Sequence, residues 1–253
     1  MMDVKIFGER NTATRALKEI IQLNSASVVI PSALEERGFN LVDFLLEELR
    51  LSSVKSNEQR SDAVFSRYGE RASWKHCATN FKLAQPFKDA YLIFTVRHPA
   101  SWILSLYQNP YHLLHKKPSS IGDFLHFDWK TVARERLDQK SFKPLSLYQK
   151  KINAYKAFCK MLATAKIPFS FVKFEDLILN QEKTFQTLSS NLTNVEKDFS
   201  ELRKSTKSQK KSLDYYKNYY GKELWRKELV EVRVVLNDMV NWELFSEFDY
   251  SPL

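Results

Sequence analysis

The chain of 253 residues has few glycines, few cysteines and no long apolar run. Only 5 glycines occur, so a glycine at an expected turn is informative. The two cysteines, Cys77 and Cys159, cannot build a disulfide framework, and no histidines are spaced around them as in a zinc site. No stretch approaches the roughly 20 apolar residues that cross a bilayer, and a strand starting at Val4 leaves no room for a signal peptide. We therefore expect a cytoplasmic protein with no bound metal and no membrane span.

The composition favours one sizeable hydrophobic core and excludes a disordered chain, because 43% of the residues are hydrophobic and 18 are Phe. We expect a single domain over residues 1–253. The excess of 39 Lys and Arg over 30 Asp and Glu gives a net charge of +9. That charge suits an anionic ligand, and a nucleic-acid partner is an alternative, but no helix-turn-helix, zinc-finger or ribonucleoprotein motif supports it. The oligomeric state is not indicated.

Short apolar runs alternate with segments of helical spacing, which is typical of a parallel α/β fold. The run at 90–96 is almost wholly apolar, as in a strand buried on both faces. The pattern predicts strands at 4–7, 27–30, 72–77, 90–96 and 169–173, and helices after residue 14, at 41–51, from residue 99, through much of 121–165, at 181–192 and through 215–244, with a polar loop at 52–66.

The first candidate site is the loop that follows the opening strand. Gly8 ends this strand, and a helix begins a few residues later, so unpaired amides and the helix dipole point at one place and favour an anion. Thr12 and Thr14 add hydroxyls, while Arg10 and Arg15 add charge. The Walker pattern of Gly-Lys-Ser/Thr is absent, which disfavours an ordinary ATPase or GTPase. A capped helix with solvated arginines is the alternative interpretation.

The second candidate site lies at the carboxyl end of the most hydrophobic strand. Arg97 leaves that strand, Pro99 opens a helix, and Ser105 follows on the same helix. Ligands of open α/β sheets bind at this edge, where an arginine and a serine can hold a second phosphate by charge-assisted hydrogen bonds. The alternative is a surface salt bridge beside an incidental serine.

Together these segments resemble the sulfotransferase family, whose members transfer a sulfuryl group from 3′-phosphoadenosine 5′-phosphosulfate. The sequence IFGERNTATRAL at 6–17 is similar to the family's 5′-phosphosulfate loop, and VRHP at 96–99 with SLY at 105–107 is similar to its 3′-phosphate segment. Weaker support comes from FEDL at 174–177 and from NWE at 241–243 followed by Tyr250. The resemblance implies a three-layer parallel sheet flanked by helices, with a P-loop-like sulfotransferase architecture, and it implies no metal cofactor.

The resemblance also implies roles for individual residues. The 5′-phosphosulfate is expected on six loop residues and the 3′-phosphate on two later ones: Arg10, Asn11, Thr12, Ala13, Thr14 and Arg15, then Arg97 and Ser105. The loop departs from the family at two of these positions, with Asn11 where many members have a basic residue and Ala13 where they have glycine. Because alanine enters left-handed backbone space less easily than glycine, we expect a differently shaped loop, and a weak or inactive enzyme stays open.

Sulfuryl transfer requires a positioned donor, stabilisation of the leaving phosphate and a base for the acceptor. His76 is the candidate base, since the family places a histidine at a strand end between the two phosphate segments. Arg10 and Lys75 are candidates to stabilise the leaving group. The alternatives are that His76 is a packed histidine, that Lys75 is a solvated charge, and that the base is a carboxylate, Glu35 or Glu36.

The sequence does not identify the acceptor: a carbohydrate or a small metabolite is our first expectation, and a lipid head group and a protein tyrosine are the alternatives. Aromatic side chains suited to an acceptor pocket are numerous, and a basic run at 203–211 either closes over the 3′-phosphate or is a solvated loop. His112 and His115 are three residues apart, but no third zinc ligand is evident. The alternative functions are a kinase and a catalytically silent nucleotide-binding protein.

Overall fold

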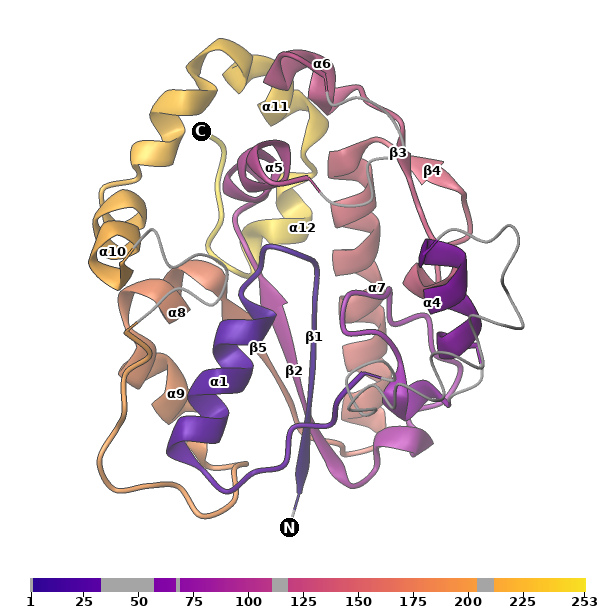
Figure 1. Ribbon diagram of the computed structural model, residues 1–253, viewed down its shortest axis with the longest axis vertical. Helices are drawn as coiled ribbons and strands as arrows, with labels where there is room; N and C mark the ends of the chain where they lie inside the picture. Colours follow the sequence, from indigo (N-terminus) through magenta and orange to yellow (C-terminus); the bar gives the residue numbers. More distant parts are fainter. Residues whose placement is uncertain (1, 33–56, 67–68, 111–117, 204–211) are drawn as a thin grey trace.

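A computed structural model describes residues 2–32, 57–66, 69–110, 118–203 and 212–253. Its central feature is a parallel sheet of three strands, β1 (Asp3–Gly8), β2 (Ala90–Val96) and β5 (Phe169–Lys173), in the order β1-β2-β5. Helices lie on both faces of this sheet (Figure 1). The chain is therefore an α/β protein with a three-stranded parallel sheet flanked by helices.

The remaining elements connect and surround the strands. The helices are α1 (Thr14–Asn24), α4 (Asn57–Phe65), α5 (Pro99–Gln108), α6 (Ile121–Leu125), α7 (Pro144–Thr164), α8 (Phe174–Leu179), α9 (Gln181–Ser189), α10 (Leu213–Gly221), α11 (Arg233–Met239) and α12 (Trp242–Ser246). Short 3₁₀ helices cover Glu70–Ala72, Gln85–Phe87, Ala133–Glu135 and Leu224–Val232, and β3 (Trp129–Lys130) pairs antiparallel with β4 (Ser141–Phe142).

Alternation along the strands divides the core into two layers, because successive side chains of a strand point to opposite faces. Ile6 and Ile93 pack with α1 and α9 on one face. Phe7 and Phe94 point to the other face, where the Phe94 ring lies 5.5 Å from that of Tyr155 on α7. All seven residues of β2 are buried, since the strand is central and covered on both faces. This explains the apolar run that predicted it.

Three of the predicted strands are confirmed, and so are the starts of three predicted helices, since α1 begins at Thr14, α5 at Pro99 and α9 at Gln181. The run at 90–96 is β2, 4–7 lies within β1, and 169–173 is β5. The helix predicted from Pro99 is α5, with proline in its first turn. Its N-cap is His98, whose side chain accepts a hydrogen bond of 3.2 Å from the amide of Ala100.

Two predicted strands are wrong in extent or type. The segment 72–77 is the end of a 3₁₀ helix followed by a turn, because the Lys75 carbonyl accepts from the Gly8 amide (2.9 Å) while the Cys77 amide bonds locally to Trp74. The segment 27–30 forms a single parallel bridge between Val29 and Val4 rather than a strand. Pro31 follows at once, and it has no amide hydrogen to extend the ladder.

The loop predicted at 52–66 is wrong over Asn57–Phe65, which form α4. The region 121–165 is also less helical than expected, since the strands β3 and β4 separate α6 from α7. The 215–244 region is helical with breaks, whereas the helix predicted at 41–51 lies outside the described residues. None of the helices in the described ranges is long and apolar enough to cross a membrane.

Candidate functional site

The loop from β1 to α1 is fastened to the central strand. Gly8 is required by close packing, because a Cβ placed there would lie 1.8 Å from the Thr95 Oγ1 atom of β2. Thr12 Oγ1 donates to the Glu9 carbonyl (2.6 Å) and lies 2.6 Å from Thr95 Oγ1. The Thr12 hydroxyl, predicted to contact the cofactor, thus holds the loop in place.

Two residues of this loop have left-handed backbone conformations, Asn11 (φ 67°) and Ala13 (φ 67°, ψ 25°). Ala13 thus adopts the left-handed conformation that alanine enters less easily than glycine, and this conformation costs about 1–2 kcal/mol for a non-glycine residue. Helix α1 then begins at Thr14 without a side-chain cap or an acidic first turn among the described residues, and Arg15 is exposed. The first amides of α1 and the positive end of its dipole therefore favour an anion.

The two predicted segments are in direct contact. Arg97 Nη1 donates to the Asn11 carbonyl at 2.8 Å, and Trp102 Nε1, on α5, donates to the Arg10 carbonyl at 2.9 Å. Both donors come from the end of β2 and the helix after it. The second segment thus holds the loop between β1 and α1 in position by hydrogen bonds to two successive backbone carbonyls.

Arg97 is only 3% exposed and has further partners inside the protein. Its Nε donates to Ser101 Oγ and its Nη2 to the Tyr220 hydroxyl, both at 2.6 Å, and its guanidinium carbon lies 4.0 Å from the ring centroid of Phe174. Ser105, predicted to bind the 3′-phosphate together with Arg97, is not among these contacts, because it lies one helical turn beyond Ser101 and is partly exposed. Arg97 therefore joins the loop, α5 and α10.

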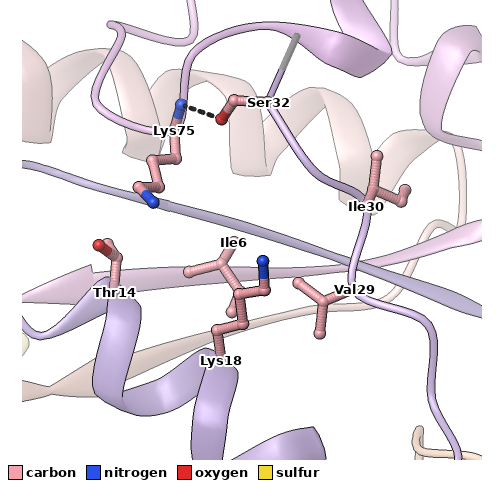
Figure 2. Close-up of a pocket in the computed structure, with 7 residues that line it drawn as sticks. All are labelled: Ile6, Thr14, Lys18, Val29, Ile30, Ser32 and Lys75. Atoms are coloured by element: carbon pink, nitrogen blue, oxygen red, sulfur yellow. Dashed lines mark hydrogen bonds between the residues drawn. The ribbon is translucent and has the colours of Figure 1, made fainter. Parts of the chain in front are cut away.

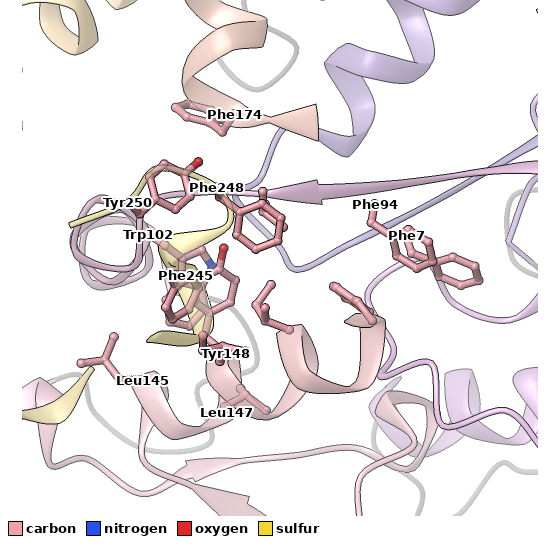
Figure 3. Packing of buried hydrophobic residues seen from close by; sticks show 14 of the residues in the cluster. Phe7, Phe94, Trp102, Leu145, Leu147, Tyr148, Phe174, Phe245, Phe248 and Tyr250 are labelled. Carbon is pink, nitrogen blue, oxygen red and sulfur yellow. The ribbon is translucent and has the colours of Figure 1, made fainter. Parts of the chain in front are cut away.

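The backbone of Arg97 is fixed as well. The Tyr148 hydroxyl on α7 accepts from the Arg97 amide and donates to its carbonyl, both at 2.8 Å. The Tyr148 ring stacks between Trp102, with centroids 4.4 Å apart, and Phe245, with centroids 5.7 Å apart (Figure 3). This aromatic stack sets the position of the strand end on which Arg97 is carried.

The later motifs of the resemblance meet at the same strand end. Glu175 of FEDL accepts a hydrogen bond from the His98 amide (3.2 Å) and one from the Tyr250 hydroxyl (2.5 Å). Burial raises the pKa of Glu175, although the positive charge of Arg97 opposes the rise. Both ring nitrogens of His98 are used, since Nδ1 accepts from Ala100 and Nε2 lies 3.0 Å from the Ser251 carbonyl. His98 is therefore neutral with the proton on Nε2, and burial lowers its pKa to about 4.

A buried ion group lies beneath the loop. Lys151 of α7 contacts the carboxylates of Glu9 and Glu135, the latter at 2.8 Å, and all three side chains are fully buried. The Glu135 contact is an ion pair without hydrogen-bond geometry. Burial raises the pKa of Glu135, with Lys151 opposing the rise and Glu9 adding to it. Because Glu9 Oε1 also accepts from the Arg10 amide (2.6 Å), this group determines how the loop leaves β1.

His76, the candidate base, lies in the turn that packs against Gly8. Its Nδ1 is 2.6 Å from the Gly8 carbonyl, and since a carbonyl only accepts, Nδ1 carries the proton and Nε2 is free of one. Burial lowers the pKa of His76 well below its usual value, and the charge of Arg10 lowers it further. His76 is thus a neutral imidazole with the tautomer that a proton acceptor requires. The Arg10 guanidinium is partly buried, 5.1 Å from the ring centroid of Trp74.

A small pocket adjoins the start of α1 on the side away from β2 (Figure 2). Its polar lining is two lysines, Lys18 and Lys75, and two hydroxyl residues, Thr14 and Ser32; Ser32 Oγ accepts from the Lys75 amide at 3.2 Å. Its apolar lining is Ile6, Val29 and Ile30. The candidate catalytic residue Lys75 is therefore part of a basic pocket rather than of the aromatic stack.

Several sequence candidates lie outside the described residues, namely Glu35, Glu36, His112, His115 and 204–211. Of the tyrosines, Tyr220 bonds to Arg97 as above. The rings of Tyr215 and Tyr219 stack along α10, 5.8 Å apart.

Sequence reasoning missed the residues that hold the loop, above all Glu9, Lys151 and Trp102. A signal existed for Lys151, since it falls with Tyr148 and Tyr155 at helical spacing on the buried face of α7. A charged residue on such a face is normally paired.

A scan against protein-family models found no match to this chain, and a search of curated proteins found no similar sequence.

Proposed function

We propose that this chain is a sulfotransferase that moves a sulfuryl group from 3′-phosphoadenosine 5′-phosphosulfate to a hydroxyl or amine of an acceptor. The observation that carries the proposal is the contact of Arg97 with the Asn11 carbonyl at 2.8 Å. It brings the proposed 5′-phosphosulfate loop and the proposed 3′-phosphate segment into one site. The start of α1, with its uncapped amides and two left-handed residues before it, suits the 5′ end of the donor.

In this proposal the chain's own groups have distinct roles. The amides at the start of α1 and the Thr14 hydroxyl hold the phosphosulfate, while Arg10 and Lys75 stabilise charge on the leaving phosphate. The acceptor oxygen or nitrogen attacks sulfur, the bond from sulfur to the bridging phosphate oxygen breaks, and that electron pair leaves with 3′-phosphoadenosine 5′-phosphate. The acceptor's proton passes to Nε2 of His76, the nitrogen that its bond to Gly8 leaves unprotonated.

The 3′-phosphate is assigned to Ser105 and to the positive charge of Arg97. Three of the five N–H groups of Arg97 already donate within the protein, so its role in positioning the loop accompanies any role in binding. Because these three N–H groups are already used within the protein, a second candidate function is favoured, that of a nucleotide-binding protein that does not recognise a 3′-phosphate.

Calorimetric binding of 3′-phosphoadenosine 5′-phosphate, compared with adenosine 5′-monophosphate, separates these two functions. We expect the bisphosphate to bind at least about tenfold more tightly, because one charge-assisted hydrogen bond contributes roughly 1.5–3 kcal/mol. Ser105→Ala should remove much of that preference, whereas Ser146→Ala, at an exposed serine of α7, should not. Equal affinity for the two nucleotides would reject the sulfotransferase in favour of the second candidate.

The catalytic role of His76 is tested separately with His76→Asn, which keeps a donor for the Gly8 carbonyl. We expect this variant to bind the bisphosphate as the wild type does. Transfer of labelled sulfate to an acceptor panel should fall by about 10²-fold or more, as for loss of a general base. Unchanged transfer would assign the base elsewhere.

A further inference from the structure

The indole of Trp74 contacts two of the groups to which the proposed function gives chemical roles. Trp74 is 8% exposed and lies two residues before His76. The guanidinium carbon of Arg10 is 5.1 Å from its ring centroid. The imidazole of His76 meets the indole at an interplanar angle of 86°, with the ring centroids 5.1 Å apart. One ring therefore touches both the proposed stabiliser of the leaving phosphate and the proposed base.

The position of this indole is set from another part of the chain. The guanidinium carbon of Arg134 lies 4.7 Å from the Trp74 ring centroid. Arg134 is fixed by Asp62 of α4, which accepts from its Nη1 at 2.8 Å and from its backbone amide at 3.2 Å. The second oxygen of Asp62 accepts from the Ala133 amide at 2.9 Å. The indole thus rests on an anchored cation and offers Arg10 a surface of defined position.

The side chain of Arg10 gains order from this contact. Its backbone is held on both sides, since its amide donates to Glu9 Oε1 at 2.6 Å and its carbonyl accepts from Trp102 Nε1 at 2.9 Å. The long side chain must still lose rotamer freedom to place its guanidinium. Among aromatic rings, that of tryptophan attracts a guanidinium most strongly, and the attraction grows where water is partly excluded. Arg10 is partly buried, so its contact with Trp74 keeps the guanidinium near His76.

We infer that Trp74 is a positioning residue for sulfuryl transfer, which holds the Arg10 guanidinium beside His76 and at the leaving phosphate. The inference rests on the proposed function for the reaction, and on the ring contacts for the positioning. It adds a residue that has no bond to make or break in the reaction and that acts through Arg10. Loss of the indole should therefore impair transfer only in a protein that has Arg10.

The titration of His76 reports where the Arg10 guanidinium lies. The charged groups around this histidine come from four segments, and they are Arg10, Lys75 and Lys151, with the carboxylates Glu9 and Glu135 that pair with Lys151. Burial is the main cause that lowers the pKa of His76, and the charge of Arg10 lowers it further. If the guanidinium moves away, the pKa of His76 rises. Looser packing that admits water raises the same pKa, so the test must separate the two causes.

The test is a double-mutant cycle of Trp74→Leu and Arg10→Gln in the full chain. NMR titration of the imidazole signals gives the pKa of His76, with His76→Asn to assign them, and transfer of labelled sulfate gives kcat and KM. We expect Trp74→Leu to raise the pKa of His76 and to lower kcat about tenfold, while the KM for the donor changes less than about threefold. In the Arg10→Gln protein, Trp74→Leu should change kcat less than about twofold and leave the pKa of His76 where Arg10→Gln puts it.

Two further variants control for packing. Phe65→Leu removes a ring whose centroid lies 6.5 Å from that of Trp74, but it keeps the indole, so kcat should change less than about twofold. A fluorinated tryptophan in place of Trp74 keeps the shape of the ring and weakens its electron-rich face. It should lower kcat in the same direction as Trp74→Leu, and it takes the place of that variant in the cycle if Trp74→Leu does not fold.

The outcomes separate this inference from the proposed function. Equal effects of Trp74→Leu with and without Arg10 would overturn the inference, because loss of packing acts in both proteins. Wild-type transfer by the fluorinated protein would overturn it as well. If the wild type itself transfers no sulfate, the proposed function fails, and the role of Trp74 in transfer fails with it. The NMR cycle then still decides the contact: a change in the pKa of His76 that depends on Arg10 supports it, and an independent change rejects it.

Discussion

Removal of the buried cation Lys151 should destabilise the protein severely. Its side chain is fully buried and contacts the equally buried carboxylates of Glu9 and Glu135. Lys151→Met keeps most of the side-chain volume but leaves two buried carboxylates without their counter-ion. Breaking a buried ion pair by removing one partner costs about 3–5 kcal/mol, a large part of the roughly 5–15 kcal/mol by which a typical domain is stable.

The assay is urea unfolding followed by circular dichroism, with Lys160→Met as the matched control. Lys160 lies on the same helix but is exposed, so its substitution should change the free energy of unfolding by less than about 0.5 kcal/mol. If Lys151→Met does not fold, the triple variant with Glu9→Gln and Glu135→Gln provides the measurement. It removes all the charges together, and we expect it to regain at least about 2 kcal/mol.

The loss of folding free energy caused by Lys151→Met should also depend on pH. The pKa of Glu135 is already raised by burial and is held down by Lys151, so loss of the lysine raises it further. A carboxyl whose pKa is higher in the folded than in the unfolded state destabilises the fold above that pKa, and the penalty disappears as the pH falls toward the unfolded value. The Lys151→Met penalty should therefore be larger near pH 8 than near pH 5. A penalty below about 1 kcal/mol at both pH values would refute this account of the ion group.

Three further perturbations test the site at other points. Gly8→Ala places a methyl against Thr95 Oγ1 and should cost about 1–3 kcal/mol in thermal or urea unfolding, whereas Gly69→Ala, with open space around it, should cost almost nothing. Ala13→Gly relieves the left-handed strain and should raise the free energy of unfolding by about 0.5–1 kcal/mol; a loss would show that the strain is absent. His98 has a pKa of about 4 in the fold against 6.5 ordinarily, so its protonation is resisted by the folded state. Its contribution to stability is complete above about pH 6.5 and should be lost by about 3 kcal/mol as the pH falls to 4, and His98→Gln should remove that part of the pH dependence.

Local patterns in the sequence determined the central strands of the fold and the positions of the two segments that we propose bind the donor. Strand β2 could be predicted to the residue, because a strand buried on both faces must be apolar at every position. The start of α5 followed from Pro99, whose fixed φ suits a first helical turn. Burial and periodicity are properties of a few neighbouring residues, so the sequence displays them directly.

Tertiary structure alone decided which groups meet. Arg97 could be predicted to follow β2 at the carboxyl edge of the sheet, but its bond to Asn11, 86 residues earlier in the chain, could not. The same holds for Lys151 and Glu9, which are 142 residues apart. The residues next to a hydrogen-bond donor or a charge in the sequence do not indicate which group will be its partner. The partner is the acceptor or opposite charge that the folded loops and helices place within contact distance. For this reason the three strands of the parallel sheet and the starts of three helices were predictable, while the contacts that hold the loop required the three-dimensional fold.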